Sequence, residues 1–189
     1  MSALSLDSKL VCVFGLRGTG KSVWVNRLAT GYKKKALVFD TLGEIAGKTP
    51  YDFYAPVARD EVDELCQIID FTRQKGYKLL VIDEANRYAE PKPKPLPPCL
   101  RDLVDYSRHW KLTVCWVARR PIQVHSDIIE LSDYLVLFRL TGRLDRTYLD
   151  SLATGLGEAV FTLPDWHYIL VNPDRSFKRY QPVQPVKLS

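Results

Sequence analysis

The chain has 189 residues, of which 46% are hydrophobic and 26% are charged. These proportions exclude a largely disordered chain, and the length favours one domain with a sizeable core. The net charge of +5 permits a polyanionic partner without requiring one. The longest apolar runs, residues 112–118 and 134–138, are far shorter than the roughly 20 residues that a membrane-spanning helix needs.

The amino terminus has no secretory signal, because residues 1–7 contain no basic segment followed by an apolar one. We therefore expect a cytoplasmic protein. The four cysteines form no C-x-x-C pair, and we expect all of them to be small core residues: Cys12, Cys66, Cys99 and Cys115. The three histidines share no metal-like spacing with the cysteines, which argues against a zinc site: His109, His125 and His167.

The first half of the chain alternates short apolar runs with segments of helical spacing. Residues 10–14, 35–40 and 77–82 predict buried strands. Helices are expected at residues 22–32 and 59–75. Between them, the irregular stretch from Thr41 to Pro56 contains glycines and prolines and predicts a loop or a small insertion.

The second half continues this alternation after a proline-rich segment. Residues 91–98, PKPKPLPP, predict an extended loop, because proline lacks an N–H donor. Helices are expected next at residues 99–109, 124–131 and 142–153. Strands are expected between them at residues 112–118 and 133–138.

The last part of the chain has a different pattern. Residues 159–162 and 166–171 are strand-like, and a turn at 172–176 leads to a further strand at 177–180, so we expect a terminal β-hairpin. Residues 181–189 are expected to form an ordered arm or a frayed end.

Residues 15–22, GLRGTGKS, match the phosphate-loop pattern G-x-x-x-x-G-K-[ST], also called Walker A, between the first strand and the first helix. In this pattern backbone N–H groups surround the phosphates of ATP, and the helix dipole favours the anion. Lys21 would reach the β- and γ-phosphates, and Ser22 would supply a hydroxyl ligand to Mg²⁺. The expected nucleotide-binding residues are Gly15, Arg17, Gly18, Thr19, Gly20, Lys21 and Ser22.

The strand at 77–82 ends in Asp83 and Glu84, which match the Walker B pattern. Asp83 is the expected carboxylate on the metal side, and Glu84 is expected to orient and polarise the attacking water. A glutamate here favours hydrolysis over phosphoryl transfer to a small acceptor. The alternative is a strand that ends in two surface acids.

Charge that develops on the γ-phosphate also requires a cation. Arg119 and Arg120 follow the strand 112–118, where a side chain reaches the crevice above the sheet. Arg119 is the leading candidate, and a surface or ion-pair role is the alternative. The other arginines that remain open are Arg17, Arg87, Arg108, Arg143 and Arg146.

These elements predict an α/β fold: a P-loop NTPase three-layer sandwich with a mostly parallel central sheet and a C-terminal β-hairpin. We expect a single domain over residues 1–189. Its core would span about residues 9–155, and the hairpin and tail about 156–189.

Four segments in the same order resemble the FtsK–HerA superfamily of DNA-pumping ATPases. They are the two Walker segments, the D-x-x-G-E segment from Asp40 to Glu44, and a segment at 117–121 similar to the strand-end Q-R-P of that superfamily. In the Q-R-P segment of that superfamily, a polar residue senses the γ-phosphate. In this chain, Arg119 occupies the position of the Gln. The resemblance covers about residues 9–150 and is greatest to the genome-packaging ATPases of membrane-containing icosahedral double-stranded DNA viruses.

This resemblance implies an ATP-hydrolysing motor that uses Mg²⁺ and moves double-stranded DNA into a preformed capsid. It implies a ring, usually a hexamer, with ATP between subunits, DNA in the central channel, and docking to a capsid vertex or membrane protein. The protein would act in the host cytoplasm or in association with the virion. An arginine would complete the neighbouring subunit's site, and the candidates are Arg17, Arg119, Arg120, Arg143 and Arg146.

The residues that contact DNA are open at this stage. Lysines on mobile loops suffice for sequence-independent pumping. The loop with Lys92 and Lys94 is one candidate, and a stiff surface connector is the alternative. Residues 177–180 mix aromatic and basic side chains, for which packing within a hairpin is favoured over base stacking.

Three other functions compete with the packaging motor. One is a morphogenesis or secretion ATPase that resembles the zonula occludens toxin-like proteins of filamentous phages, which usually carry a membrane span. The second is a small-molecule kinase, against which Glu84 and the D-x-x-G-E segment count. The third is a nucleotide-gated assembly factor that does not act on DNA.

Overall fold

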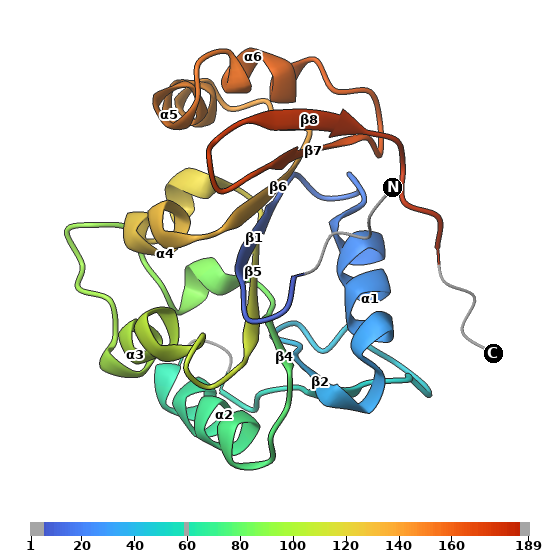
Figure 1. Ribbon diagram of the computed structural model, residues 1–189, viewed down its shortest axis with the longest axis vertical. Helices are drawn as coiled ribbons and strands as arrows, with labels where there is room; N and C mark the ends of the chain where they lie inside the picture. Colours follow the sequence, from blue (N-terminus) through green and yellow to red (C-terminus); the bar gives the residue numbers. More distant parts are fainter. Residues whose placement is uncertain (1–5, 59–60, 186–189) are drawn as a thin grey trace.

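The fold is built on an eight-stranded sheet, seen in the computed structural model of the chain, which describes residues 6–58 and 61–185 (Figure 1). The strand order is β3-β2-β4-β5-β1-β6-β7-β8. The strands are β1 Leu10–Phe14, β2 Ala36–Phe39, β3 Asp52–Tyr54, β4 Leu79–Ile82, β5 Thr113–Ala118, β6 Tyr134–Phe138, β7 Tyr168–Val171 and β8 Phe177–Tyr180. Strands β1 to β6 pair in parallel, and β7 and β8 are antiparallel, which confirms the predicted sheet with its terminal hairpin.

Helices cover both faces of this sheet, as the predicted three layers require. Helix α1 packs on one face, and the other α-helices pack on the opposite face (Figure 1). The central strands are therefore enclosed on both sides, which explains why they read as continuous apolar runs. The α-helices are α1 Lys21–Tyr32, α2 Val62–Gln74, α3 Pro98–Tyr106, α4 Ser126–Leu131, α5 Arg143–Leu152 and α6 Leu156–Phe161. The short 3₁₀ helices are η1 Lys33–Lys35, η2 Ala85–Arg87 and η3 Pro121–Gln123.

The parallel register brings the ends of four strands to one edge. Phe14 of β1 is opposite Ala118 of β5, and Ile82 of β4 is opposite both Trp116 of β5 and Phe39 of β2. The residues that follow these strands, Gly15, Asp40, Asp83 and Arg119, therefore gather at the carboxyl edge of the sheet.

Two local predictions were wrong in type. The predicted strand at 159–162 lies mainly in helix α6, which begins after Gly155 at φ 79° and buries Leu156 and Val160, four residues apart, on one face. The irregular segment from Thr41 to Pro56 contains the edge strand β3, parallel to β2. This strand was missed because it has only three residues and none of them is fully buried.

The prediction that all four cysteines are core thiols was also wrong for two of them. Cys66 of α2 and Cys99 of α3 form a disulfide, with their Cα atoms 5.7 Å apart. The residues lie 33 positions apart in sequence and become neighbours only because the two helices pack together. Cys12 and Cys115 are free and buried in the sheet, as predicted.

None of the helices within residues 6–58 and 61–185 has the length and apolar character needed to cross a membrane. Residues 181–185 continue from β8 without regular structure, and the rest of the predicted arm, residues 186–189, lies outside the described residues.

We expect the Cys66–Cys99 bridge to stabilise the fold by about 3 kcal/mol, because it removes loop-closure entropy from the unfolded chain. The free energy of unfolding in guanidinium should fall by this amount in the double variant Cys66→Ser, Cys99→Ser. Alkylation of the denatured, unreduced protein should label only Cys12 and Cys115. Labelling of all four cysteines would contradict the bridge.

Candidate functional site

The loop after β1 is folded tightly against β6, and glycine is required at both of its ends. A Cβ on Gly15 would lie 2.5 Å from Phe138 Cβ and 2.7 Å from Thr19 Oγ1. Gly20 has φ +111°, and a Cβ there would lie 3.1 Å from the Phe138 ring. Gly18 has φ +78° and open space around it, so its backbone is accessible to a ligand.

Helix α1 starts directly from this loop and presents the groups that bind an anion. Its first-turn N–H groups have no intrahelical partners, and the helix dipole adds partial positive charge. Lys21 is the first residue of the helix, and its Nζ donates to the carbonyl oxygens of Gly15 at 2.6 Å and Leu16 at 3.0 Å. Ser22 follows it and is exposed. The loop therefore has the form of a phosphate site.

Two acids face this loop from the end of β4. The pKa of Asp83 is raised to about 6, chiefly by burial and to a smaller extent by the carboxylates of Glu84 and Asp40, while a hydrogen bond with the backbone of Glu84 and the charge of Lys21 oppose the rise. Burial also lowers the pKa of Lys21, against the effect of Asp83 and Glu84. A buried carboxylate of this kind is stabilised in its charged form by a cation close by.

The donor set at this edge fits Mg²⁺. A hard ion that retains several waters is held by one or two protein oxygens together with the phosphates of the substrate. Ser22 and Asp83 offer one hydroxyl and one carboxylate in the same cleft. Within the described part of the chain, no group of three or more His, Cys, Asp or Glu side chains is arranged to hold a metal by itself.

Glu84 and Arg119 are linked directly. Arg119 donates from Nε at 3.1 Å and Nη2 at 2.9 Å to Glu84 Oε1. The Glu84 side chain is only 12% exposed, whereas that of Arg119 is 52% exposed. Glu84 also has a left-handed backbone, with φ 47° and ψ 45°, which is uncommon for a residue with a side chain and is typical of functional sites.

The two Walker segments line one cleft of about 550 Å³. Helix α1, the end of β5 and the segment after β2 complete its walls. The sequence-predicted residues found in it are Arg17, Gly18, Lys21, Ser22, Asp83, Glu84 and Arg119. The structure adds residues that the sequence did not single out for this site, namely Asn26 and Tyr51, whose hydroxyl donates to Asn26 Oδ1 at 2.9 Å.

Asp40 fixes the wall that follows β2. Its buried carboxylate accepts from the backbone N–H groups of Gly43 at 3.1 Å, Glu44 at 3.2 Å and Ile45 at 2.7 Å. The signal in the sequence was an aspartate followed by a glycine, which is typical of a turn closed by a side chain. The D-x-x-G-E segment therefore has a physical role, since it positions Glu44 at the cleft.

Most of the other arginines have carboxylate partners away from the cleft. Arg120 Nε donates to Asp145 Oδ2 at 2.8 Å, and this aspartate is buried, so Arg120 has a structural role. Arg146 pairs with Glu158 at 2.7 Å, and Arg108 pairs with Asp133. Arg143 is exposed at the start of α5 and does not line the cleft.

Solved structures with the same fold include two viral packaging enzymes. The genome-packaging NTPase B204 of Sulfolobus turreted icosahedral virus 2, in complex with ATP-gammaS, has a TM-score of 0.80 and 17% identity, over 94% of this chain and 98% of that chain. The DNA-packaging ATPase B204 of Sulfolobus turreted icosahedral virus has a TM-score of 0.80 and 14% identity, over 95% of this chain and 100% of that chain. Neither a protein-family model nor a curated protein matches the sequence.

A third structure is more distant. The N-terminal domain of zonular occludens toxin from Neisseria meningitidis has a TM-score of 0.55 and 10% identity, over 93% of this chain and 95% of that chain. The similarity to the two B204 structures extends over nearly the whole of each chain. This chain therefore has the P-loop NTPase fold of viral genome-packaging ATPases, as the resemblance to the FtsK–HerA superfamily implied.

Proposed function

We propose that this protein hydrolyses ATP to ADP and phosphate. The observation that carries the proposal is the single cleft in which Lys21, Asp83 and Glu84 meet at the carboxyl edge of the sheet. Lys21 and the first turn of α1 would hold the phosphates, and Ser22 with Asp83 would hold Mg²⁺. Bound Mg²⁺ supplies charge neutralisation at the phosphate oxygens.

Glu84 would orient and polarise the attacking water, and Arg119 would respond to the γ-phosphate. Arg119 holds Glu84 through two hydrogen bonds to one oxygen. The phosphate oxygens are strong acceptors for the same guanidinium. Their competition for Arg119 would free the Glu84 carboxylate for the water, so that hydrolysis follows full occupation of the site.

We further propose that hydrolysis drives double-stranded DNA into a viral capsid. The support is the similarity to the B204 packaging enzymes, which covers 94% and 95% of this chain. The place of action would be the host cytoplasm or the virion, with docking at a capsid vertex or a membrane protein.

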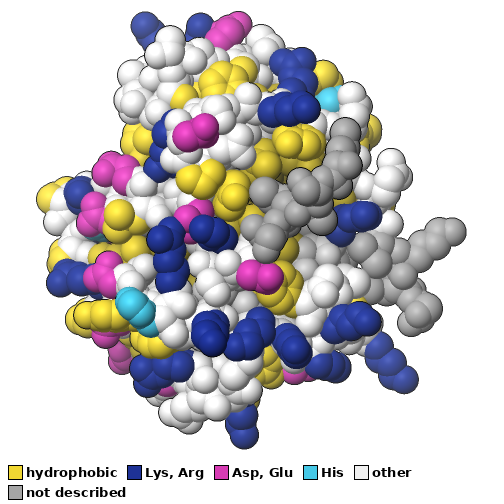
Figure 2. Space-filling view, in the orientation of Figure 1, with side chains coloured by type: hydrophobic (Ala, Val, Ile, Leu, Met, Phe, Trp, Pro, Cys, Tyr) yellow, Lys and Arg dark blue, Asp and Glu magenta, His cyan; other side chains and the backbone are white. Residues whose placement is uncertain are grey.

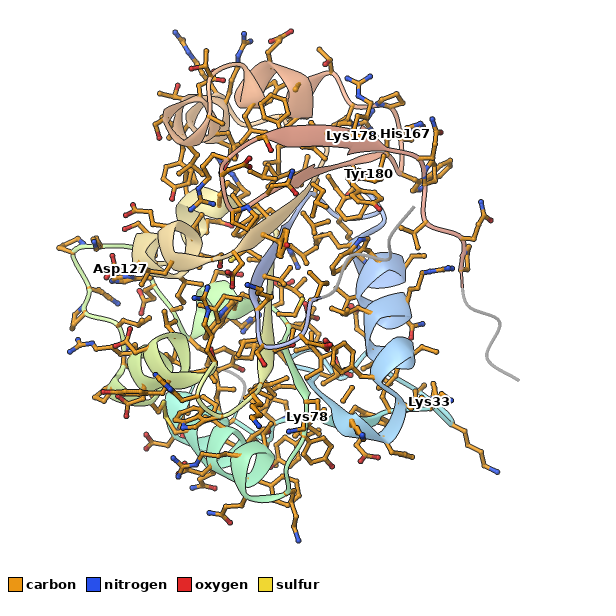
Figure 3. The ribbon with its side chains drawn as sticks, in the orientation of Figure 1. Lys33, Lys78, Asp127, His167, Lys178 and Tyr180 are labelled. Atoms are coloured by element: carbon orange, nitrogen blue, oxygen red, sulfur yellow. A yellow bond between two sulfur atoms is a disulfide. The ribbon has the colours of Figure 1, made fainter. Side chains whose placement is uncertain are left out.

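The charge distribution favours one surface for DNA, and it is not the proline-rich loop. Lys92 pairs with Asp127 at 2.6 Å, and Lys94 pairs with Glu90 at 2.6 Å. These local partners reduce the positive potential that the loop offers to phosphates. Asp127 lies on the opposite side of the molecule from α1 in Figure 3.

The amino edge of the sheet carries a row of lysines instead. Lys78 N donates to Lys35 O at 2.8 Å, and Thr113 N donates to Lys78 O at 2.9 Å, so Lys35 and Lys78 enter adjacent strands. Figure 2 shows a band of basic side chains below the centre of the view, and Lys33 and Lys78 lie toward this end in Figure 3. The row consists of Lys33, Lys35, Lys75, Lys78 and Lys111. Within residues 6–58 and 61–185, none of these five lysines has a carboxylate within ion-pair distance. Such a row suits the phosphates of a nucleic acid, independent of sequence.

A ring of subunits, of which a hexamer is the usual form, would complete the site. Of the arginines expected to act on a neighbouring subunit, Arg119, Arg120 and Arg146 each have a carboxylate partner in their own chain. Arg143 is exposed and lies beside Leu144, which is 66% exposed. We therefore favour Arg143 as the donor in trans, with Arg17 serving its own site.

The second candidate function is a morphogenesis or secretion ATPase, because the zonular occludens toxin domain has the same fold. Such a protein would hydrolyse ATP without a response to DNA. Stimulation by DNA therefore separates the two functions.

We expect Lys21→Ala to lose ATP binding, because the phosphates lose their main cation. Glu84→Gln should bind ATP normally and hydrolyse it about 10²- to 10⁴-fold more slowly, which is the usual contribution of a general base. Calorimetry with ATP and steady-state phosphate release test both variants, with Lys94→Ala as the control. Rapid turnover by Glu84→Gln would exclude the assigned role.

Long double-stranded DNA should raise the hydrolysis rate at low salt if the protein is a packaging motor. We expect Lys35→Ala with Lys78→Ala to keep the basal rate and to lower the salt slope of DNA affinity by about 0.9 for each lost phosphate contact. The matched control is Lys92→Ala with Lys94→Ala, which should retain stimulation. The opposite pattern would assign DNA to the proline-rich loop, and no stimulation in the unmodified protein would favour the morphogenesis function.

Arg143→Ala should bind ATP normally but hydrolyse it at least 10-fold more slowly, because a cation would be missing from the neighbouring site. Mixing it with Glu84→Gln subunits, which retain Arg143, should restore activity in part. Failure of the mixture to exceed the two separate proteins would argue against a role in trans.

A further inference from the structure

Trp166 is the most unusual exposed side chain near the phosphate loop. It lies in the connection between α6 and β7 and is 60% exposed. Its backbone has φ 61°, in the left-handed region that bulky residues rarely adopt. More than half of the residue is exposed, so burial in a core does not explain why a tryptophan occupies this strained position.

The register of the sheet places Trp166 beside the loop that holds the phosphates. Tyr168 of β7 is opposite Phe138 of β6, so the residues that precede β7 lie at the carboxyl edge. A Cβ on Gly20 would lie 3.8 Å from Trp166 Cα. His167, the next residue, lies near the start of α1 in Figure 3.

Contacts on both sides hold this connection in place. Asp165 pairs with Arg139 at 2.6 Å, directly after β6. His167 Nε2 is 2.9 Å from Gln181 Oε1, and its Nδ1 is 3.0 Å from the carbonyl oxygen of Asp165. Trp166 is therefore displayed from a segment that is fixed at both of its neighbours, which is the preorganisation expected of a ligand contact.

The direction of a bound nucleotide follows from the Walker residues. Asp83 and Glu84 after β4 and Arg119 after β5 lie on one side of β1, so the γ-phosphate and the metal belong on that side. The α-phosphate, the ribose and the base must then leave the loop in another direction. Strands β6 and β7 occupy the other side of β1, and Trp166 is at their carboxyl edge.

We propose that Trp166 is the stacking platform for the base of the nucleoside triphosphate held by the phosphate loop. This inference rests on the proposed nucleotide binding and assigns the part of that site which the Walker motifs leave open. The flat apolar face of an indole suits the face of a nucleobase, and stacking of this kind tolerates different bases.

The test compares ATP with inorganic tripolyphosphate, which has the phosphates but no base. In calorimetric titrations we expect Trp166→Ala to weaken ATP binding about 10- to 100-fold, the range that loss of one stacked base gives. Tripolyphosphate should bind within about twofold of the unmodified protein. Trp166→Phe should recover most of the ATP affinity, and Tyr106→Ala, which removes a half-exposed aromatic ring elsewhere, should change neither ligand.

A second readout uses the unmodified protein and does not depend on the alanine variant. ATP should quench the emission of the exposed tryptophan, tripolyphosphate should not, and the quench should be absent in Trp166→Phe. An equal loss of both ligands in Trp166→Ala would mean that Trp166 only supports the loop. Unchanged ATP affinity, or a change confined to subunit assembly, would also overturn the proposal. If the unmodified protein binds tripolyphosphate and ATP equally well, the phosphate site is supported and the stacking platform is wrong. If it binds neither ligand, the proposed nucleotide-binding function itself is wrong.

Discussion

The parallel register of β4, β5 and β1 is the constraint on which the site depends. The three strands run side by side in one direction, so the residues that leave them reach the same edge of the sheet. Gly18, Asp83 and Arg119 are far apart in sequence and share a cleft through this pairing. A slip of one residue would turn the buried side chains of a strand to its other face. The buried apolar strands therefore fix the geometry of the cleft as well as the core.

The sequence predicted the elements that depend on local chemistry. Continuous apolar runs marked the central strands, and the glycines of the phosphate loop marked a turn that no other residue fits. Helix α6 was missed because its short apolar run suits a strand or a buried helix equally well. The Cys66–Cys99 bridge and the ion pairs of the arginines could not be predicted, since they depend on which helices pack together. Trp166 was missed because its position follows from the antiparallel pairing of β7 with β6.

The basic side chains at the two ends of the sheet differ in how many have carboxylate partners. At the carboxyl edge and beside it, Arg119, Arg120 and Arg146 are held by carboxylates of the same chain. Of these three, only Arg119 lines the cleft, where a held cation has a defined position that suits chemistry on a phosphate. At the amino edge, Lys34 pairs with Asp52, whereas Lys35 and Lys78 have no carboxylate within ion-pair distance among residues 6–58 and 61–185. One sheet thus separates the surface proposed for chemistry from the surface proposed for DNA.

The link between Arg119 and Glu84 bears on how the proposed ATPase would avoid hydrolysis before its site is fully occupied. The Glu84 side chain is 12% exposed, and one of its oxygens accepts two hydrogen bonds from the Arg119 guanidinium, so this oxygen is engaged by Arg119 rather than by a water. Glu84 also stands in a left-handed backbone conformation, which a residue with a side chain seldom adopts and which is typical of functional sites. Only a competing anion at the γ-position would draw Arg119 away while the backbone keeps Glu84 in place. The same contact would therefore restrain the enzyme before ATP binds and release it afterwards.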